Sequence, residues 1–173
     1  MNGGWLLLPF LLVRFGLPPL LDQEALRRAA HFAPRQGGER AAYAVYQGAN
    51  AGIFLGLFFL RIRWSPAWLL WTGVACYLLG LGLCAASLVS FSHPDGDGLN
   101  TRRLYRFSRN PIYLAYFLCF VGMAALTQSP ALLGLTAVFQ CCAHWIILAE
   151  ERWCAQRFGA RYAAYCRRVR RYL

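Results

Sequence analysis

The chain has 173 residues, a hydrophobic fraction of 58% and a net charge of +11. So high a hydrophobic fraction excludes an ordinary soluble domain of this size. The positive charge suits either nucleic acid or an anionic membrane surface, and the hydropathy decides for the membrane and against nucleic acid. The composition therefore predicts an integral membrane protein.

Residues 5–21 form the first apolar segment, which Arg14, Pro18 and Pro19 interrupt. A signal peptide is the competing interpretation, but the segment lacks a basic stretch before its apolar core and a small-residue cleavage site after it. We therefore predict a kinked first membrane helix, and the sequence leaves open whether it crosses the bilayer completely. Residues 22–40 are polar, hold four arginines and predict a loop.

Two long apolar runs, residues 41–60 and 66–91, predict spanning helices that form a hairpin around RIRWS and the helix-starting Pro66. The first run carries glycines at four-residue intervals, namely Gly48, Gly52 and Gly56. Such a stripe lets a neighbouring helix approach closely in lipid, but glycine is also frequent in membrane helices, and both interpretations stay open.

A second apolar hairpin, residues 112–127 and 131–148, turns at Gln128, Ser129 and Pro130. Both runs are near the minimum length for crossing about 30 Å of hydrocarbon. They bring the expected number of spans to about five. The predicted fold class is all-α, a multi-span helical membrane protein.

Seven cysteines are present, none in a CxxC pair, and most lie inside apolar helical runs. We interpret them as reduced packing residues. Cys141, Cys142 and His144 lie close in sequence, but three residues on one buried helix without a second group of ligands make a poor metal site. No metal is predicted.

The tail, residues 149–173, carries seven arginines and is amphipathic. At helical spacing, one side holds Phe158, Tyr162, Tyr165 and Val169, and another holds Arg157, Arg161, Arg168 and Arg171. This pattern predicts a C-terminal amphipathic helix along the membrane interface, with a solvated basic tail as the alternative.

Most arginines lie on one side of the predicted topology. Residues 22–40, 92–110 and 149–173 share that side and hold 15 of the 18 arginines. The positive-inside rule places this side in the cytoplasm.

The segment LNTRRLYRFSRNPIY, residues 99–113, crowds four arginines, two tyrosines and an Asn-Pro step against an apolar run. Asn110 as N-cap and Pro111 at the first helical position predict the start of the fourth span. The backbone amides that follow lack intrahelical partners and favour an anion, and Arg109 lies beside them. We therefore predict a carboxylate or phosphate site here.

Further arginines precede this helix start. Arg102, Arg106 and Arg109 follow i, i+4, i+7 and share a face if the segment is helical. Arg102 and Arg103 favour a role in topology and contact with anionic lipid headgroups.

Two tyrosines and two glutamates keep alternative interpretations open. Tyr105 and Tyr113 suit an aromatic belt at the membrane interface as well as a site. Glu150 and Glu151 end the fifth span, where acidic groups oppose the helix dipole. They predict either structural ion pairs or a functional carboxylate that faces a cationic ligand.

Two motifs, LYRFSRNPIY and then AEERWCAQRFGARYAAYCRRV, resemble the membrane methyltransferases that include isoprenylcysteine carboxyl methyltransferases and phospholipid methyltransferases. That family has a tyrosine, an Arg-His-Pro-x-Tyr segment that opens a membrane helix, and, after a helical hairpin, a Glu-Glu pair, a Phe-Gly and a tyrosine-rich basic tail. The similarity divides the single membrane domain, residues 1–173, into N-terminal spans and a loop, residues 1–65, and a methyltransferase-like core, residues 66–173, with its cytoplasmic tail.

The resemblance implies a cytoplasm-facing pocket for S-adenosylmethionine, closed over by the tail. Arg109 and the free helix amides suit the carboxylate of the cofactor, and Glu150 suits its ribose hydroxyls or its positive charge. With the positions that the family pattern implies, the expected cofactor-binding residues are Leu99, Asn100, Tyr105, Arg109, Asn110, Pro111, Ile112, Tyr113 and Glu150.

Two departures from the family pattern matter. Asn110 replaces the usual histidine, which excludes a titrating imidazole there. A sulfonium already activates its methyl group, so the protein mainly has to position the nucleophile and exclude water. The isoprenylcysteine enzymes share an arginine about one turn before the paired glutamates, and Ile146 stands near that position here. A prenylcysteine carboxylate is therefore not the expected substrate.

We therefore expect an S-adenosylmethionine-dependent methyltransferase, with membrane lipids as partners. Its acceptor is a lipid-like or apolar small molecule from the bilayer with an amine, thiol or carboxylate nucleophile. Direct in-line transfer is expected, and no catalytic residue is assigned. The alternatives are a membrane reductase that uses NADPH, since sterol reductases carry a similar C-terminal region, and a non-catalytic membrane protein with a degraded site.

Overall fold

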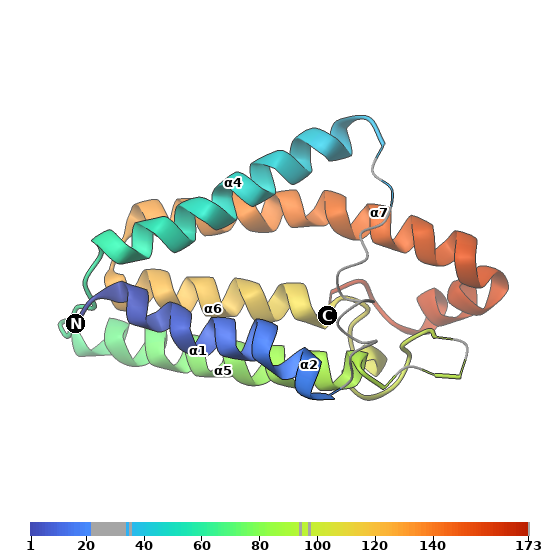
Figure 1. The fold of residues 1–173 in the computed structure, drawn as a ribbon, viewed down its shortest axis with the longest axis horizontal. Coiled ribbons are helices and arrows are strands. Elements are labelled where there is room, and N and C mark those ends of the chain that lie inside the picture. Colours follow the sequence, from blue (N-terminus) through green and yellow to red (C-terminus); the bar gives the residue numbers. More distant parts are fainter. Residues whose placement is uncertain (22–33, 35, 94, 97, 173) are drawn as a thin grey trace.

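The computed structural model describes residues 1–21, 34, 36–93, 95–96 and 98–172 (Figure 1). Most of the predicted polar loop 22–40 lies outside the described residues. The described elements are helical: η1 (Gly3–Leu6), α1 (Leu7–Leu11), η2 (Leu12–Gly16), α2 (Leu17–Leu21), α4 (Gly38–Phe59), α5 (Ala67–Phe91), η3 (Arg103–Arg106), α6 (Pro111–Thr127) and α7 (Pro130–Arg168). The all-α prediction is confirmed.

The helical segments fall where the five spans were predicted. Three stretches are long and apolar enough to cross a membrane, namely Gly3–Leu21, α5 and α7. The apolar helix α6 is shorter, with 17 residues. Helix α4 has 22 residues, but it does not reach the same hydropathy, because Gln47 and Asn50 interrupt its apolar run. The multi-span helical architecture is thus confirmed.

Helices α5 and α6 pack closely along their length (Figure 1). A Cβ atom on Gly122 of α6 would lie 2.6 Å from the backbone nitrogen of Tyr77, and one on Gly80 of α5 would lie 2.6 Å from that of Cys119. Glycine is therefore required at both contacts, as in other closely packed membrane helices.

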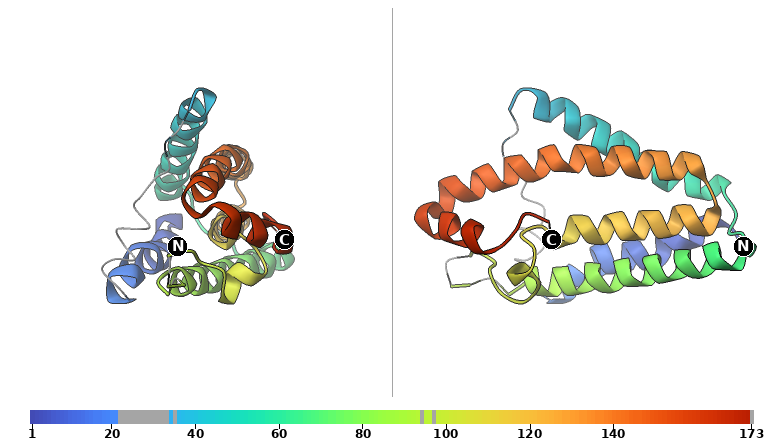
Figure 2. Two further views of the ribbon diagram at one scale, coloured as in Figure 1. Left: turned by 90° about the vertical axis from the view of Figure 1, so that its right-hand side faces the viewer. Right: turned by 180° about the vertical axis from the view of Figure 1, so that it is seen from behind.

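Helix α4 packs mainly against α7 (Figure 2). Two glycines of the predicted stripe, Gly52 and Gly56, lie against the side chains of Leu135 and Leu132, whereas Gly48 has nothing close to it. The core between these helices and α6 contains Phe120 and Phe139, whose ring centroids are 4.9 Å apart. Both side chains are fully buried.

Helix α7 differs from the prediction, because the fifth span and the tail form one helix. Nothing in the sequence between Leu148 and Phe158 breaks the helix. The change of direction comes at Gly159, with φ 51° and ψ −127°, a conformation open essentially to glycine alone. Residues 160–168 then fold back toward the rest of the protein (Figure 2).

The amphipathic tail helix is present, but its apolar face packs on protein. Tyr162 and Tyr165 are buried and form a cluster with Leu99. Arg157, Arg161 and Arg168 on the other side are exposed. The tail therefore covers the segment that begins at Leu99.

Candidate functional site

A cavity of about 730 Å³ lies at the end of the helical bundle where α6 begins. Its polar part is lined by residues from the segment before α6, from α6 itself and from α7. Its apolar part extends between the N-terminal segment, α4, α6 and α7, and is lined by Phe10, Phe54, Tyr116, Phe120 and Phe139. A polar and an apolar compartment thus share one space.

The structure brings eight of the nine predicted site residues to this cavity. They are Leu99, Asn100, Tyr105, Arg109, Asn110, Ile112, Tyr113 and Glu150. The ninth, Pro111, is buried at the first turn of α6 and does not line the cavity. Burial raises the pKa of Tyr105 above its usual value, because a charged phenolate is disfavoured away from water.

Glu150 faces the cavity and is paired with a tyrosine of α6. The hydroxyl of Tyr113 donates a hydrogen bond of 3.0 Å to Oε1 of Glu150. The Tyr113 ring packs edge-on against Tyr116, with centroids 6.5 Å apart. This contact joins the end of the fifth predicted span to the start of the fourth.

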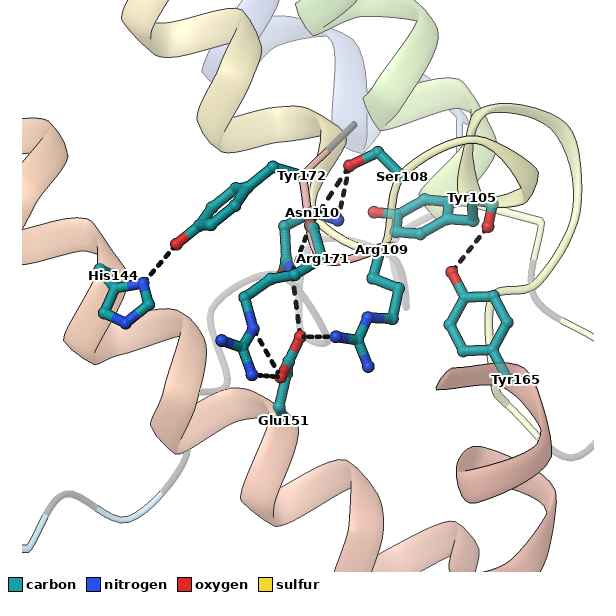
Figure 3. Close-up of polar contacts among 9 residues, drawn as sticks. All are labelled: Tyr105, Ser108, Arg109, Asn110, His144, Glu151, Tyr165, Arg171 and Tyr172. Atoms are coloured by element: carbon teal, nitrogen blue, oxygen red, sulfur yellow. Dashed lines mark hydrogen bonds and ion pairs between the residues drawn. The ribbon is translucent and has the colours of Figure 1, made fainter. Parts of the chain in front are cut away.

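Glu151, the next residue, is the centre of a separate ion-pair network (Figure 3). Its carboxylate lies 3.2 Å from Nη2 of Arg109 and 2.9 Å from Nη2 of Arg171, and Asn110 Nδ2 donates to it at 3.4 Å. The hydrogen bond to Glu151 raises the pKa of Arg171. Of the two roles predicted for the glutamates, structural ion pairs or a functional carboxylate, Glu151 therefore shows the ion pairs.

The start of α6 differs in detail from the predicted anion site. Asn110 stands at the N-cap position, but its side chain makes no capping bond and donates instead to Glu151 and to the carbonyl of Arg171. The amide of Arg109 donates to the carbonyl of Arg170. Residues of the tail thus occupy the polar groups around the helix start (Figure 3).

The three arginines expected on one face have different surroundings. The segment before α6 holds only the short helix η3, so no continuous helix aligns them. Arg102 pairs with Asp95 at 2.7 Å, Arg106 is exposed, and Arg109 pairs with Glu151. Nε of Arg109 is buried and has no hydrogen-bond partner among the described residues.

Several cavity residues were missed by the sequence analysis. Tyr162, Tyr165 and Cys154 of α7 line the cavity, and the hydroxyl of Tyr165 donates to the carbonyl of Tyr105 at 2.7 Å. The helical stripe of tail aromatics was visible in the sequence, but it predicted a face toward the membrane. Arg14 and Asn50 also line the cavity. In the sequence, each stands out as a polar residue within an apolar run, which is the feature that could have identified it.

Metal ligands are not gathered in the part of the chain that the structure describes. There, no group of three or more histidine, cysteine, aspartate or glutamate side chains is arranged to hold a metal ion. His144 instead forms a hydrogen bond with the hydroxyl of Tyr172 (Figure 3).

A family model described as phospholipid methyltransferase matches residues 68–161, more than half of the chain. The chain belongs to this family. Within the phospholipid methyltransferase match lie all of α5 except Ala67, the segment 99–113, α6 and both glutamates, whereas the N-terminal segment and α4 lie outside it. No curated protein and no solved structure matches the chain. Family membership and the apolar helices support a membrane methyltransferase.

Proposed function

We propose that the protein is an S-adenosylmethionine-dependent methyltransferase that acts on a lipid-like or apolar small molecule taken from the bilayer. The observation that carries this proposal is that one cavity has both a polar and an apolar part. A polar cofactor and an apolar acceptor bound in these two parts would meet inside one cavity.

The polar part fits the cofactor by its unsatisfied groups. Nε of Arg109 and Oδ1 of Asn100 are buried, line the cavity and lack partners among the described residues. The first suits a carboxylate, and the second accepts a hydrogen bond from an amino or hydroxyl group. Glu150 keeps Oε2 free of hydrogen bonds among the described residues, so it is available for the ribose hydroxyls or the positive charge.

The apolar part fits the acceptor. Phe10, Phe120 and Phe139 supply an aromatic wall that excludes water from a hydrocarbon chain. Phe15 of η2 and Gln47 of α4 also line the cavity and are exposed. The cavity therefore reaches the surface between the N-terminal segment and α4, where an acceptor dissolved in the bilayer has access.

The chain's residues act by positioning. When bound, S-adenosylmethionine would supply a methyl group on a sulfonium sulfur, and this group would pass directly to the nucleophilic atom of the acceptor. The carboxamide of Asn110 does not titrate, so it does not serve as an acid or a base. It anchors the tail by donating hydrogen bonds to Glu151 and to the carbonyl of Arg171. Glu150 and Tyr113 orient the ligands, and the tail tyrosines keep water out. No covalent enzyme intermediate is required.

We also propose that the polar end of the cavity faces the cytoplasm. The segments predicted on that side, which hold 15 of the 18 arginines, include residues 92–110 and the tail.

Two measurements on the detergent-purified protein test the proposed function. In calorimetry, S-adenosylmethionine is expected to bind and NADPH is not. Labelled methyl groups are expected to pass to a lipid extract, and Glu150→Ala is expected to reduce the transfer at least tenfold. The control is Gln156→Ala, an exposed position on the same helix.

The alternatives give different results. Binding of NADPH without S-adenosylmethionine would point to a reductase. Binding of neither cofactor, with no labelled product above a no-protein blank, would point to a non-catalytic membrane protein.

A further inference from the structure

Arg14 is a charged residue inside the first apolar helix. It lies in η2, a π-helical turn within the candidate span Gly3–Leu21. Such turns often occur at functional sites. The side chain lines the cavity, and no carboxylate among the described residues lies within ion-pair distance of its guanidinium.

The contacts of Arg14 leave its charge uncompensated. The guanidinium carbon lies 5.5 Å from the ring centroid of Tyr116 and 5.4 Å from that of Phe15. Such cation–π contacts offset only part of the cost of a charge at membrane depth. Charged side chains in membrane helices usually pair with another charged group or with backbone carbonyls, and no such partner of Arg14 lies among the described residues, so an anionic ligand would fit there.

Tyr116 provides a second, independent sign of a ligand. Its side chain is only 6% exposed, and its hydroxyl is buried without a hydrogen-bond partner among the described residues. A buried hydroxyl left unpaired costs stability unless something binds it. Tyr116 lines the cavity beside Arg14, and Asn50 of α4 lines it as well. A guanidinium, a hydroxyl and a carboxamide together form a set of donors for carboxylate or phosphate oxygens.

The position of this pair relative to the cofactor residues follows from three contacts. Arg14 contacts Tyr116, Tyr116 packs on Tyr113 at 6.5 Å, and Tyr113 donates to Glu150. Tyr113 and Tyr116 are one turn apart on α6. The pair therefore lies about one helical turn deeper than Glu150, next to the aromatic wall of Phe10, whose ring is 5.7 Å from that of Tyr116.

We propose that Arg14 and Tyr116 bind the anionic group of the methyl acceptor, which makes the acceptor an acidic amphiphile. Its carboxylate or phosphate lies at Arg14, and its hydrocarbon part lies against Phe10 and Phe120. The proposal rests on the proposed function only in identifying the ligand as the methyl acceptor. The anion site itself is argued from the contacts of Arg14 and Tyr116. Arg14 lies outside residues 68–161, so membership of the family assigns it no role.

Binding of matched amphiphiles to the detergent-purified full chain tests the proposal. The melting temperature in a neutral maltoside detergent is measured at increasing concentrations of each ligand. The ligands are dodecanoate, dodecyl phosphate, dodecyltrimethylammonium and inorganic phosphate. The native protein is expected to bind the two anionic amphiphiles at least tenfold more tightly than the cationic one.

The variants locate the site. Arg14→Gln is expected to weaken binding of the anionic amphiphiles at least tenfold, and Tyr116→Phe to weaken it severalfold. Arg14→Lys is expected to keep more affinity than Arg14→Gln, because it retains the charge. Arg63→Gln, which changes an exposed arginine outside the cavity, is expected to have no effect. If Arg14→Gln does not fold, Arg14→Lys and Tyr116→Phe carry the test.

Three results would overturn the proposal. These are equal affinity of the native protein and Arg14→Gln for both anionic amphiphiles, tighter binding of the cationic amphiphile, and inorganic phosphate bound as tightly as dodecyl phosphate. The last would mean a free-anion site. A parallel titration with S-adenosylmethionine separates the two proposals. Arg14-dependent amphiphile binding without cofactor binding would sink the proposed function and keep the anion site.

Discussion

Glu150 and Glu151 are neighbours in the chain, yet their side chains face different surroundings. Glu150 accepts a hydrogen bond from Tyr113 at the cavity, whereas Glu151 holds Arg109 and Arg171 together. Both glutamates line the cavity, but successive residues of a helix point about 100° apart, so Glu150 meets Tyr113 of α6 and Glu151 meets the tail. The sequence pair therefore combines two separate roles.

Because the two glutamates have different partners, we expect substitutions of Glu151 to affect mainly stability and substitutions of Glu150 to affect mainly cofactor binding. The carboxylate of Glu151 and the guanidinium of Arg109 are each only 12% exposed, so Glu151→Gln leaves two arginines without their counter-charge. We expect a loss of about 2 kcal/mol in stability, measured by thermal unfolding in detergent. Glu150→Gln is expected to lower stability less and to weaken S-adenosylmethionine binding more. The reverse order of effects would contradict this assignment.

At the scale of the elements, the α5–α6 contact depends on glycine. A methyl group on Gly122 would overlap the backbone of Tyr77, which has no room to move inside a helix. We expect Gly122→Ala to lower stability by about 1 to 3 kcal/mol, as overpacking generally does. Gly82→Ala is the matched control, because nothing lies within 4 Å of a Cβ at that position. Equal melting temperatures for the two variants would contradict the close packing.

The reversal of α7 depends on a single backbone conformation. Any side chain at Gly159 is strained at its φ of 51° and ψ of −127°, at a cost of about 1 to 3 kcal/mol. We expect Gly159→Ala to loosen the tail, so that limited proteolysis cuts residues 160–172 faster and S-adenosylmethionine binds more weakly. Gly134→Ala on the same helix serves as the control, because its Cβ would be in open space. Unchanged proteolysis in both variants would argue against a closed tail.

At the scale of the whole molecule, the arginine distribution predicts orientation. The tail alone carries seven arginines, and it contacts the polar end of the cavity. We expect a fluorescent protein fused after residue 173 to fluoresce in cells, because the fluorescent protein chosen for the fusion is one that folds and becomes fluorescent in the cytoplasm. A phosphatase that is active only outside the cytoplasm, fused at the same point, is the control and is expected to be silent. The opposite pair of results would invert the orientation.

The sequence by itself determined where the helices begin and eight of the residues that line the cavity. Hydropathy located the start of each predicted apolar helix to within a few residues, because a helix in hydrocarbon must satisfy its backbone internally and carry apolar side chains. The family pattern pointed to Asn100, Tyr105, Tyr113 and Glu150, and the structure brings them to one cavity.

Only the tertiary structure decided which side chains meet. The pairing of Glu151 with Arg109, the packing of Tyr162 on Leu99 and the position of Arg14 beside Tyr116 join segments far apart in the chain. Such contacts depend on helix rotation and on the reversal at Gly159, which hydropathy does not encode. The interruption at Arg14 was thus visible in the sequence, but its place in the cavity required the fold.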